Sequence, residues 1–301
     1  MLTLPAPAKL NLFLHITGRR GDGYHLLETL FQLLDYGDEL SFDADIRTGL
    51  GLTCSNPALA TDDNLALRAA RLLIPHATVS PHCHIHLTKR VPAGGGLGGG
   101  SSDAATTLLA LNRLWRCGLS LAALERLGLQ LGADVPVFVH GHTAFAAGVG
   151  EALENQTLPE RWYIVLTPDC FVSTREIFCH PELTRNSPST TMRAFPFSGS
   201  RNDCQAVSSQ LYPPIRAALE WLGQYAEARM TGTGSSVFAS CSDREQAMTI
   251  LSRLQAEQSS VAVSRHRGLV GCQGFVARGI NQSRLHAALG LPLQDGAARR
   301  P

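Results

Sequence analysis

The sequence lacks several features that mark particular classes of protein. Its eight cysteines include no Cys-x-x-Cys pair, no apolar run reaches membrane-spanning length, and the N-terminus has no basic segment followed by an apolar one. It also has no internal repeat. We therefore expect reduced thiols, no membrane span and no secretory signal, which together favour the cytoplasm.

An excess of charge of either sign is also missing. The 301 residues carry 26 basic and 25 acidic side chains, a formal net charge of +1. This balance argues against nucleic acid or an anionic membrane as the main partner. A hydrophobic content of 44% is that of an ordinary globular protein, and the length favours two domains.

The most distinctive stretch runs from Pro92 to Ala105. Six of the seven residues from 94 to 100 are glycine, and two serines follow. No Gly-Lys-[Ser/Thr] ends the stretch, so it is not a Walker A loop, and it has too many glycines for a dinucleotide fingerprint. A helical pattern starts at once, which favours a phosphate-binding turn at a helix start over a flexible linker.

Before this stretch, apolar alternation from Leu10 predicts a strand whose opposite face carries Lys9 and Asn11. On this pattern alone, that face is expected to be solvated. Two further strands are predicted at 26–34 and 38–43, and a capped helix after Asn64.

After the loop helix, the pattern predicts a helix beginning at Ser120 and a domain boundary near residue 155. A strand at 162–167 and a capping box from Ser173 to Glu176 follow. Further predictions are an irregular loop over 185–201, a helix over 213–225, a second capping box from Ser242 to Glu245, a strand at 261–264 and a disordered tail.

Two polar groups leave the function open. His82, His84 and His86 share one face of a strand, but no acidic or thiolate partner stands beside them, so a polar strand face is preferred to a metal site. Asp134 precedes Pro136 and suits either an N-cap or a carboxylate held at a helix start for catalysis.

The Lys9 strand, the glycine loop and a second glycine turn at 230–238 resemble, in this order, the motifs of the GHMP kinases, the superfamily of galactokinase, homoserine kinase, mevalonate kinase and phosphomevalonate kinase. Within it, residues 7–12, 20–25, 132–136 and 274–281 resemble the 4-diphosphocytidyl-2-C-methyl-D-erythritol kinase family. That family transfers the γ-phosphate of ATP to the 2-hydroxyl of its cytidylylated acceptor, in the non-mevalonate route to isoprenoid precursors.

The resemblance implies an α+β fold of two domains. Residues 1–155 would form an ATP-binding domain like ribosomal protein S5 domain 2, and residues 156–287 a ferredoxin-like domain. Residues 288–301 would be a disordered tail. The active site would lie between the domains of a monomer or weak homodimer.

The resemblance also assigns the site residues. Asp134 would be the base on the acceptor hydroxyl, and Lys9 would lower the pKa of that carboxylate and stabilise developing charge. The ATP side would comprise Asn64, Leu65, Lys89, Pro92, Gly94, Gly95, Gly96, Leu97, Gly98, Gly99, Gly100, Ser101 and Ser102. The cytidine side would comprise Asn11, Tyr24, His25, Thr174 and Phe178, with Tyr24 and Phe178 stacked on either face of the cytosine.

Mg²⁺ would bridge the ATP phosphates, and no protein ligand is assigned to it. The hydroxyls of Ser101 and Ser102 are the natural candidates. Asp103 stands where many relatives carry Asn, and its charge would oppose the phosphates. We therefore expect it to turn away or to reach a metal.

Three other functions are weighed against this one. The substrate of a homoserine or mevalonate kinase carries no base that could stack on Tyr24, His25 and Phe178. A non-catalytic sensor of the same fold would have no need of both Lys9 and Asp134. An RNA-binding protein, suggested by the S5-like domain, would need a basic stripe that the sequence lacks.

Overall fold

The computed structural model describes residues 1–21, 23–45, 49–189, 200–259 and 267–291. Within these residues the chain mixes helices and strands, as the α+β prediction requires. None of the helices described is long and apolar enough to cross a membrane.

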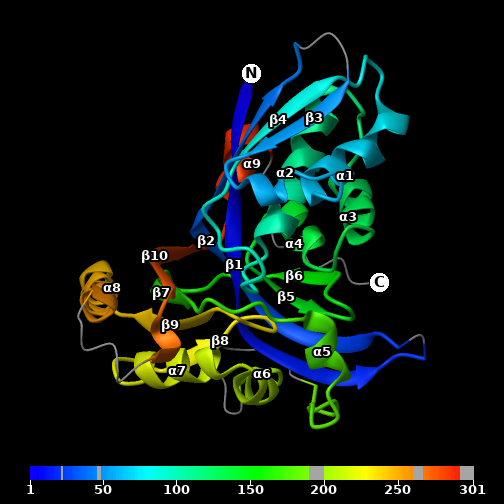
Figure 1. Ribbon diagram of the computed structural model, residues 1–301. Helices are drawn as coiled ribbons and strands as arrows, with labels where there is room; N and C mark the ends of the chain where they lie inside the picture. The colour runs from blue at the N-terminus through cyan, green and yellow to red at the C-terminus, as the bar shows by residue number, and fades with distance from the viewer. Residues whose placement is uncertain (22, 46–48, 190–199, 260–266, 292–301) are drawn as a thin grey trace.

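Two long strands form the axis of the molecule (Figure 1). β1 (Leu2–Arg19) pairs antiparallel with β2 (His25–Asp43) over nearly its whole length. β2 is continuous where two strands were predicted. Both faces of β1 are covered, and Lys9 and Asn11 are only 2% and 3% exposed. The prediction of a solvated face is therefore wrong, because alternation cannot reveal a second layer on the polar side.

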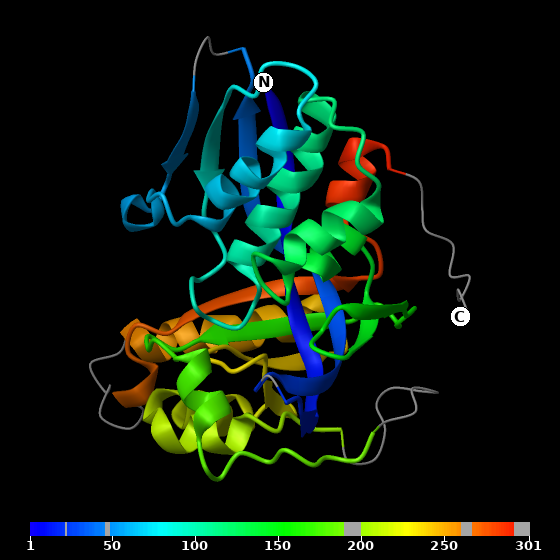
Figure 2. The same cartoon turned by 90° about the vertical axis from the view of Figure 1, so that its right-hand side faces the viewer.

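In the upper part of Figure 1, helices cover one face of the sheet around β1 and β2, as Figure 2 also shows. The strands are β3 (Leu50–Cys54), β4 (Cys83–Thr88), β5 (Ala144–Ala147) and β6 (Ala152–Asn155). The helices are α1 (Leu65–Leu73), α2 (Gly99–Leu114), α3 (Leu121–Leu129), α4 (Val135–His140) and α9 (Arg284–Leu289), with short 3₁₀ turns at Pro57–Leu59 and Ile74–His76. α2 packs closely on both α1 and β1.

In the lower part, a second layer of helices covers the strands that follow residue 160. The strands are β7 (Trp162–Thr167), β8 (Ala228–Met230), β9 (Val237–Cys241) and β10 (Gln273–Ile280). The helices are α5 (Thr174–Cys179), α6 (Gln205–Leu211), α7 (Pro213–Leu222) and α8 (Arg244–Ser259), with a 3₁₀ turn at Arg267–Leu269. Their apolar side chains form a separate hydrophobic cluster with β7 and β9.

A third hydrophobic cluster joins the two parts. Leu10 and Phe13 of β1 pack there with Tyr163 of β7 and Phe238 of β9. β10 continues the connection, because it pairs with β7 along its length and with β2 at its end. Along one path the order of the described strands is β3-β4-β2-β10-β7-β9-β8.

The C-terminal helix α9 returns to the upper part, where Leu285 and Leu289 join the first cluster. Leu289 is 7% exposed, so the tail predicted from residue 288 starts too early. Residues 292–301 lie outside the described residues. The division at residue 155 stays a prediction.

The local predictions have mixed outcomes. Asn64 caps α1, and Ser173 accepts a hydrogen bond from the N–H of Glu176, as predicted. The second capping box is wrong by one residue, because Asp243 accepts from the N–H of Gln246. The strand at 261–264 lies outside the described residues. The elements β3, β6, β8, β10, α6 and α9 were not predicted.

Candidate active site

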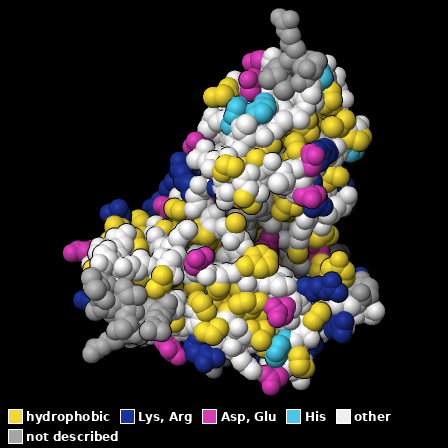
Figure 3. Space-filling model, viewed as in Figure 1, with side chains coloured by type: hydrophobic (Ala, Val, Ile, Leu, Met, Phe, Trp, Pro, Cys, Tyr) yellow, Lys and Arg dark blue, Asp and Glu magenta, His cyan; other side chains and the backbone are white. Residues whose placement is uncertain are grey.

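The glycine loop connects β4 to α2 and lies where the upper and lower parts meet. Figure 3 shows the molecule hollowed at this level. Gly98 is the N-cap of α2 in the left-handed conformation, with φ 73°, and no side chain caps the helix. Because the first N–H groups of a helix have no intrahelical acceptor, the start of α2 can bind an anion.

Two cavities adjoin this loop. One, of about 560 Å³, extends toward α1, and the other, of about 570 Å³, extends toward β1 and α5. Gly94, Gly96, Ser101 and Thr174 line both. The loop therefore lies between two spaces, each large enough for a small-molecule substrate.

Several of the glycines are required by contacts within the protein. A Cβ on Gly96 would lie 2.4 Å from the carbonyl oxygen of Thr231, and one on Gly98 would lie 2.7 Å from Phe138. Both residues have positive φ. The second glycine turn thus packs directly on the first, with the Ser236 N–H donating to the Gly95 carbonyl at 3.1 Å.

Lys9 and Asp134 meet in the 570 Å³ cavity. The Lys9 Nζ lies 3.1 Å from the Asp134 Oδ2, with the Lys9 side chain 2% and the Asp134 side chain 35% exposed. Asp134 occupies the N-cap position of α4 but makes no capping hydrogen bond with its side chain. The sequence left open whether the Asp134 carboxylate caps a helix or acts in catalysis. The structure excludes the capping role.

Asn11 holds the lysine in place. Its Oδ1 accepts from the Lys9 Nζ at 2.5 Å, and its Nδ2 donates to the Thr29 Oγ1 at 2.9 Å. The Lys9 ammonium also lies 5.3 Å from the centre of the Phe31 ring. These contacts leave the ammonium little freedom to move away from Asp134.

The ring side chains predicted for cytidine are only partly brought together. Phe178 and Thr174 line the cavity that holds Lys9, whereas His25 and Tyr24 line neither of the two cavities. His25 stacks on Phe178 with ring centres 5.1 Å apart. Tyr24 is 67% exposed, so the two-sided stack between Tyr24 and Phe178 is not formed in this structure.

Arg185 fixes the protonation of His25. Its Nε donates to the His25 Nε2 at 3.2 Å, and its Nη2 donates to the carbonyl of Phe178 at 3.0 Å. Partial burial lowers the pKa of His25, and the charges of Arg185 and Arg19 lower it further. His25 is therefore neutral, with its proton on Nδ1.

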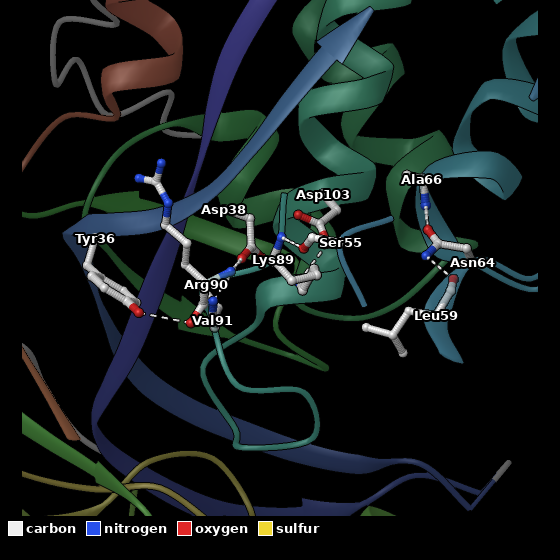
Figure 4. A network of polar contacts seen from close by, with 10 residues as sticks. All are labelled: Tyr36, Asp38, Ser55, Leu59, Asn64, Ala66, Lys89, Arg90, Val91 and Asp103. Carbon is white, nitrogen blue, oxygen red and sulfur yellow. Dashed lines mark hydrogen bonds and ion pairs between the residues drawn. The ribbon is translucent and has the colours of Figure 1, made fainter. Parts of the chain in front are cut away.

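The predicted ATP residues largely line the 560 Å³ cavity. They include Asn64, Leu65, Lys89, Pro92, the glycines from Gly94 to Gly100, Leu97 and Ser101. Ser102 is the exception, since its side chain is fully buried and lines neither cavity. The polar atoms of Asn64 are used within the fold, because Oδ1 accepts from Ala66 N and Nδ2 donates to the Leu59 carbonyl (Figure 4).

The resemblance places the turn from Gly232 to Ser235 near the acceptor, but it gives several residues of the site no role. Thr231 donates its hydroxyl hydrogen toward Asn11 and Gly96, and the Thr233 and Thr174 hydroxyls are 3.2 Å apart. Phe171, 80% exposed, borders the 570 Å³ cavity. The glycine turn beside Thr231 was a signal for the first two, whereas Phe171 and Arg185 stand in no recognisable motif.

The side chains do not fit a magnesium ion held by the protein. Among the described residues, no group of three or more His, Cys, Asp or Glu could hold a metal. Of the three carboxylates that line the cavities, Asp134 and Asp103 form ion pairs with Lys9 and Lys89, and Asp63 is exposed. Asp103 therefore turns to Lys89, and Ser101 is the one of the two predicted hydroxyls that reaches a cavity.

Two family models match the chain. "GHMP kinases N terminal domain" matches residues 64–142, which contain the glycine loop and Asp134, and "GHMP kinases C terminal" matches residues 180–259. A 4-diphosphocytidyl-2-C-methyl-D-erythritol kinase of Pseudomonas putida is 53% identical over 288 residues, 96% of each chain. The protein of that name in Hahella chejuensis is 49% identical over 94% of each chain.

Solved structures agree with the sequence relatives. A crystal structure of 4-(cytidine 5'-diphospho)-2C-methyl-D-erythritol kinase matches with a TM-score of 0.77 and 31% identity, over 93% of this chain and 100% of that chain. The mevalonate kinase of Methanococcus jannaschii matches with a TM-score of 0.65 at 12% identity, over 93% and 98% of the two chains, and shares the fold. The chain belongs to the 4-diphosphocytidyl-2-C-methyl-D-erythritol kinase family of the GHMP kinases.

Proposed function

We propose that the chain transfers the γ-phosphate of ATP to the 2-hydroxyl of 4-diphosphocytidyl-2-C-methyl-D-erythritol. The observation that carries the proposal is the Lys9–Asp134 pair, which lies in a cavity bordered by the same glycine loop as the neighbouring ATP-sized cavity. The two substrates would occupy one cavity each and meet at the loop.

On the ATP side, the phosphates would lie against the loop and the N-terminus of α2. The backbone N–H groups there can donate to phosphate oxygens without reorganising, which is the main requirement of phosphoryl transfer. The adenine would lie toward Asn64 and Leu65, with Leu65 supplying apolar contact.

At the reacting centre, the acceptor oxygen forms a bond to the γ-phosphorus as the bond to the ADP oxygen breaks. Asp134 orients the hydroxyl and accepts its proton, and the Lys9 ammonium offsets the negative charge that develops. Asn11 and Thr29 keep Lys9 in place for this role.

On the acceptor side, Phe178, on which His25 stacks in this structure, would stack on one face of the cytosine. Because the His25 proton is on Nδ1, this atom would donate to an acceptor on the cytosine edge. Tyr24, exposed in this structure, would complete the stack once the base is bound. Mevalonate and homoserine carry no base, so these aromatic contacts would not bind them.

Mg²⁺ would arrive bound to the ATP phosphates, with the Ser101 hydroxyl as the one contribution we assign to the chain. We further propose that the protein acts in the cytoplasm as a monomer or weak homodimer, with no nucleic-acid or membrane partner.

The proposal is tested by incubating the full chain with ATP, Mg²⁺ and, separately, the cytidylylated methylerythritol, mevalonate or homoserine. Phosphorus NMR should show ADP and a new phosphate monoester with the first acceptor alone. Transfer to mevalonate or homoserine at a comparable rate would overturn the proposed specificity.

A further inference from the structure

Lys89, which the sequence places on the ATP side, uses its ammonium within the protein. Its Nζ donates to the Oδ2 of Asp38 and, at 2.9 Å, to the Oδ2 of Asp103 (Figure 4). The Lys89 side chain is 10% exposed, and those of Asp38 and Asp103 are 0% and 4% exposed. These three side chains, called the Lys89 cluster below, lie behind the glycine loop.

The cluster fixes the backbone that enters the loop. The Oδ1 of Asp38 accepts from the N–H groups of Arg90, at 2.5 Å, and Val91, at 2.8 Å. Val91 immediately precedes the loop. Asp38 belongs to β2, so these bonds tie the start of the loop to the central strand pair.

Neighbouring contacts also hold residues 89–91, the entrance to the glycine loop. The Lys89 N–H donates to the Ser55 Oγ at 2.9 Å, and the Tyr36 hydroxyl donates to the Arg90 carbonyl at 2.9 Å. Tyr36 also stacks on Phe275 of β10, with ring centres 3.9 Å apart. The entrance is therefore held by groups from β2, from the segment after β3 and from β10.

The same ammonium reaches the exit of the loop. Asp103 is the fifth residue of α2, and the Lys89 Nζ lies 3.3 Å from the position of a Cβ built on Gly99. One side chain thus connects the residues before the loop to the first turns of the helix after it. With both aspartates ionised the cluster has a net charge of −1, which gives it no electrostatic attraction for phosphate.

We propose that Lys89, Asp38 and Asp103 are positioning residues that hold the two ends of the glycine loop in the geometry that binds the ATP phosphates. This inference rests on the proposed function, because it assumes that the loop is the phosphate site. Lys89 acts through the backbone of the loop. It does not act by placing its charge on the nucleotide.

The protonation states are consistent with such a network. Burial raises the pKa of Asp103 to about 7, although the Lys89 ammonium opposes the rise. Burial acts to lower the pKa of Lys89, but the two carboxylates outweigh it, and the net shift is upward. Lys89 therefore stays charged and keeps both hydrogen bonds.

The experiment is calorimetric titration of ATP into the full chain and its variants. The positioning model predicts that Lys89→Met and Asp38→Asn both weaken ATP binding, by about 10-fold or more and about 3-fold or more respectively. If the ammonium instead bound phosphate directly, Asp38→Asn would release positive charge and tighten ATP binding. The opposite sign of the Asp38→Asn effect separates the two models.

Arg90→Met is the matched control. It removes the same charge one residue further along the chain, and the Arg90 side chain points away from the Lys89 cluster (Figure 4). Its ATP affinity should stay within about 2-fold of the wild type. The KM of the cytidylylated acceptor should also stay within about 2-fold in every variant that folds, since the cluster lies on the ATP side.

Near-UV circular dichroism identifies the variants that fold. If Lys89→Met or Asp38→Asn does not fold, the test uses Asp103→Asn, which keeps the size of the side chain. An ATP affinity that is 2- to 10-fold weaker in this variant supports the proposal. An unchanged or tighter ATP affinity overturns it. If the wild type binds ATP and the Lys89→Met variant binds it equally well, the positioning role alone is overturned. A wild-type chain that does not bind ATP overturns the proposed function as well.

Discussion

The two cavities of the site are built in different ways. The one proposed for ATP takes half of its lining from a single continuous stretch, Pro92 to Ser101, and most of the rest from residues 58–65 and 87–89. The one proposed for the acceptor takes residues from β1, from the start of α4, from α5 and from the second glycine turn. There, Asn11 and Thr231 bond across a sequence separation of 220 residues. A site made from one local motif is visible in a sequence, whereas one made by folding is not.

The largest effect is expected where the two glycine turns meet. Gly96→Ala places a methyl group against the Thr231 carbonyl at a residue with φ 74°, so the free energy of unfolding should fall by about 3 kcal/mol. Urea denaturation measures this change. An unfolding free energy equal to that of the wild type would show that the turns do not pack on each other as described.

Gly100→Ala is the matched variant within the same loop. Its Cβ would lie 3.5 Å from Leu65, an ordinary contact, and Ala is favoured over Gly in a helix by about 0.5–1 kcal/mol. The chain should therefore be as stable or slightly more stable, yet bind ATP more weakly because the methyl group enters the cavity. An unchanged ATP affinity would show that the phosphates do not bind at this turn.

A smaller effect is expected on the acceptor side. Phe178→Ala should raise the KM for the cytidylylated acceptor about 2- to 10-fold, since aromatic stacking contributes about 0.5–1.5 kcal/mol beyond burial. The affinity for ATP should not change. Steady-state kinetics with each substrate varied in turn separates the two, and a rise in the KM for ATP alone would place Phe178 on the wrong side of the loop.

A further effect concerns the pH dependence of stability. The pKa of Asp103 is raised from 3.8 to about 7 in the folded chain, mainly by burial. The folded chain therefore binds the extra proton between about pH 4 and pH 7, and the stability this contributes is present below pH 4 and lost as the pH rises through 7. The Asp103→Asn variant has no carboxyl group to ionise at this position and does not lose this stability. Its unfolding free energy should therefore rise relative to that of the wild type as the pH increases across that window. Parallel urea denaturation curves measure the difference, and a constant difference would contradict it.

Much of the nucleotide side could be predicted from the sequence. The glycine run, the capped helix after Asn64 and the helical pattern after Gly100 are local signals, because turns, caps and amphipathic helices depend on residues a few positions apart. The loop residues from Pro92 to Ser101 that were predicted do line the cavity beside α1.

The remainder depends on contacts that spacing does not encode. Burial of Ser102 and the bonds of Lys89 to Asp38 and Asp103 follow from the packing of α2 against β1 and β2. Asp134 could not be assigned between a cap and a catalytic role until Lys9, 125 residues earlier, was found beside it. The resemblance supplied Lys9 and Asp134 as a pair, but the roles of Asn11 and Arg185 in holding their neighbours came from the structure.

The most direct test of the two-sided site is Asp134→Asn, measured by single-turnover transfer from ATP to the cytidylylated acceptor together with calorimetric ATP binding. Phosphate transfer should slow by about 10²- to 10⁴-fold, the usual contribution of a positioned proton acceptor, while the ATP affinity stays within about 2-fold of the wild type. Undiminished transfer, or a loss of ATP binding that accounts for the slower rate, would contradict the assignment of Asp134 to the acceptor side.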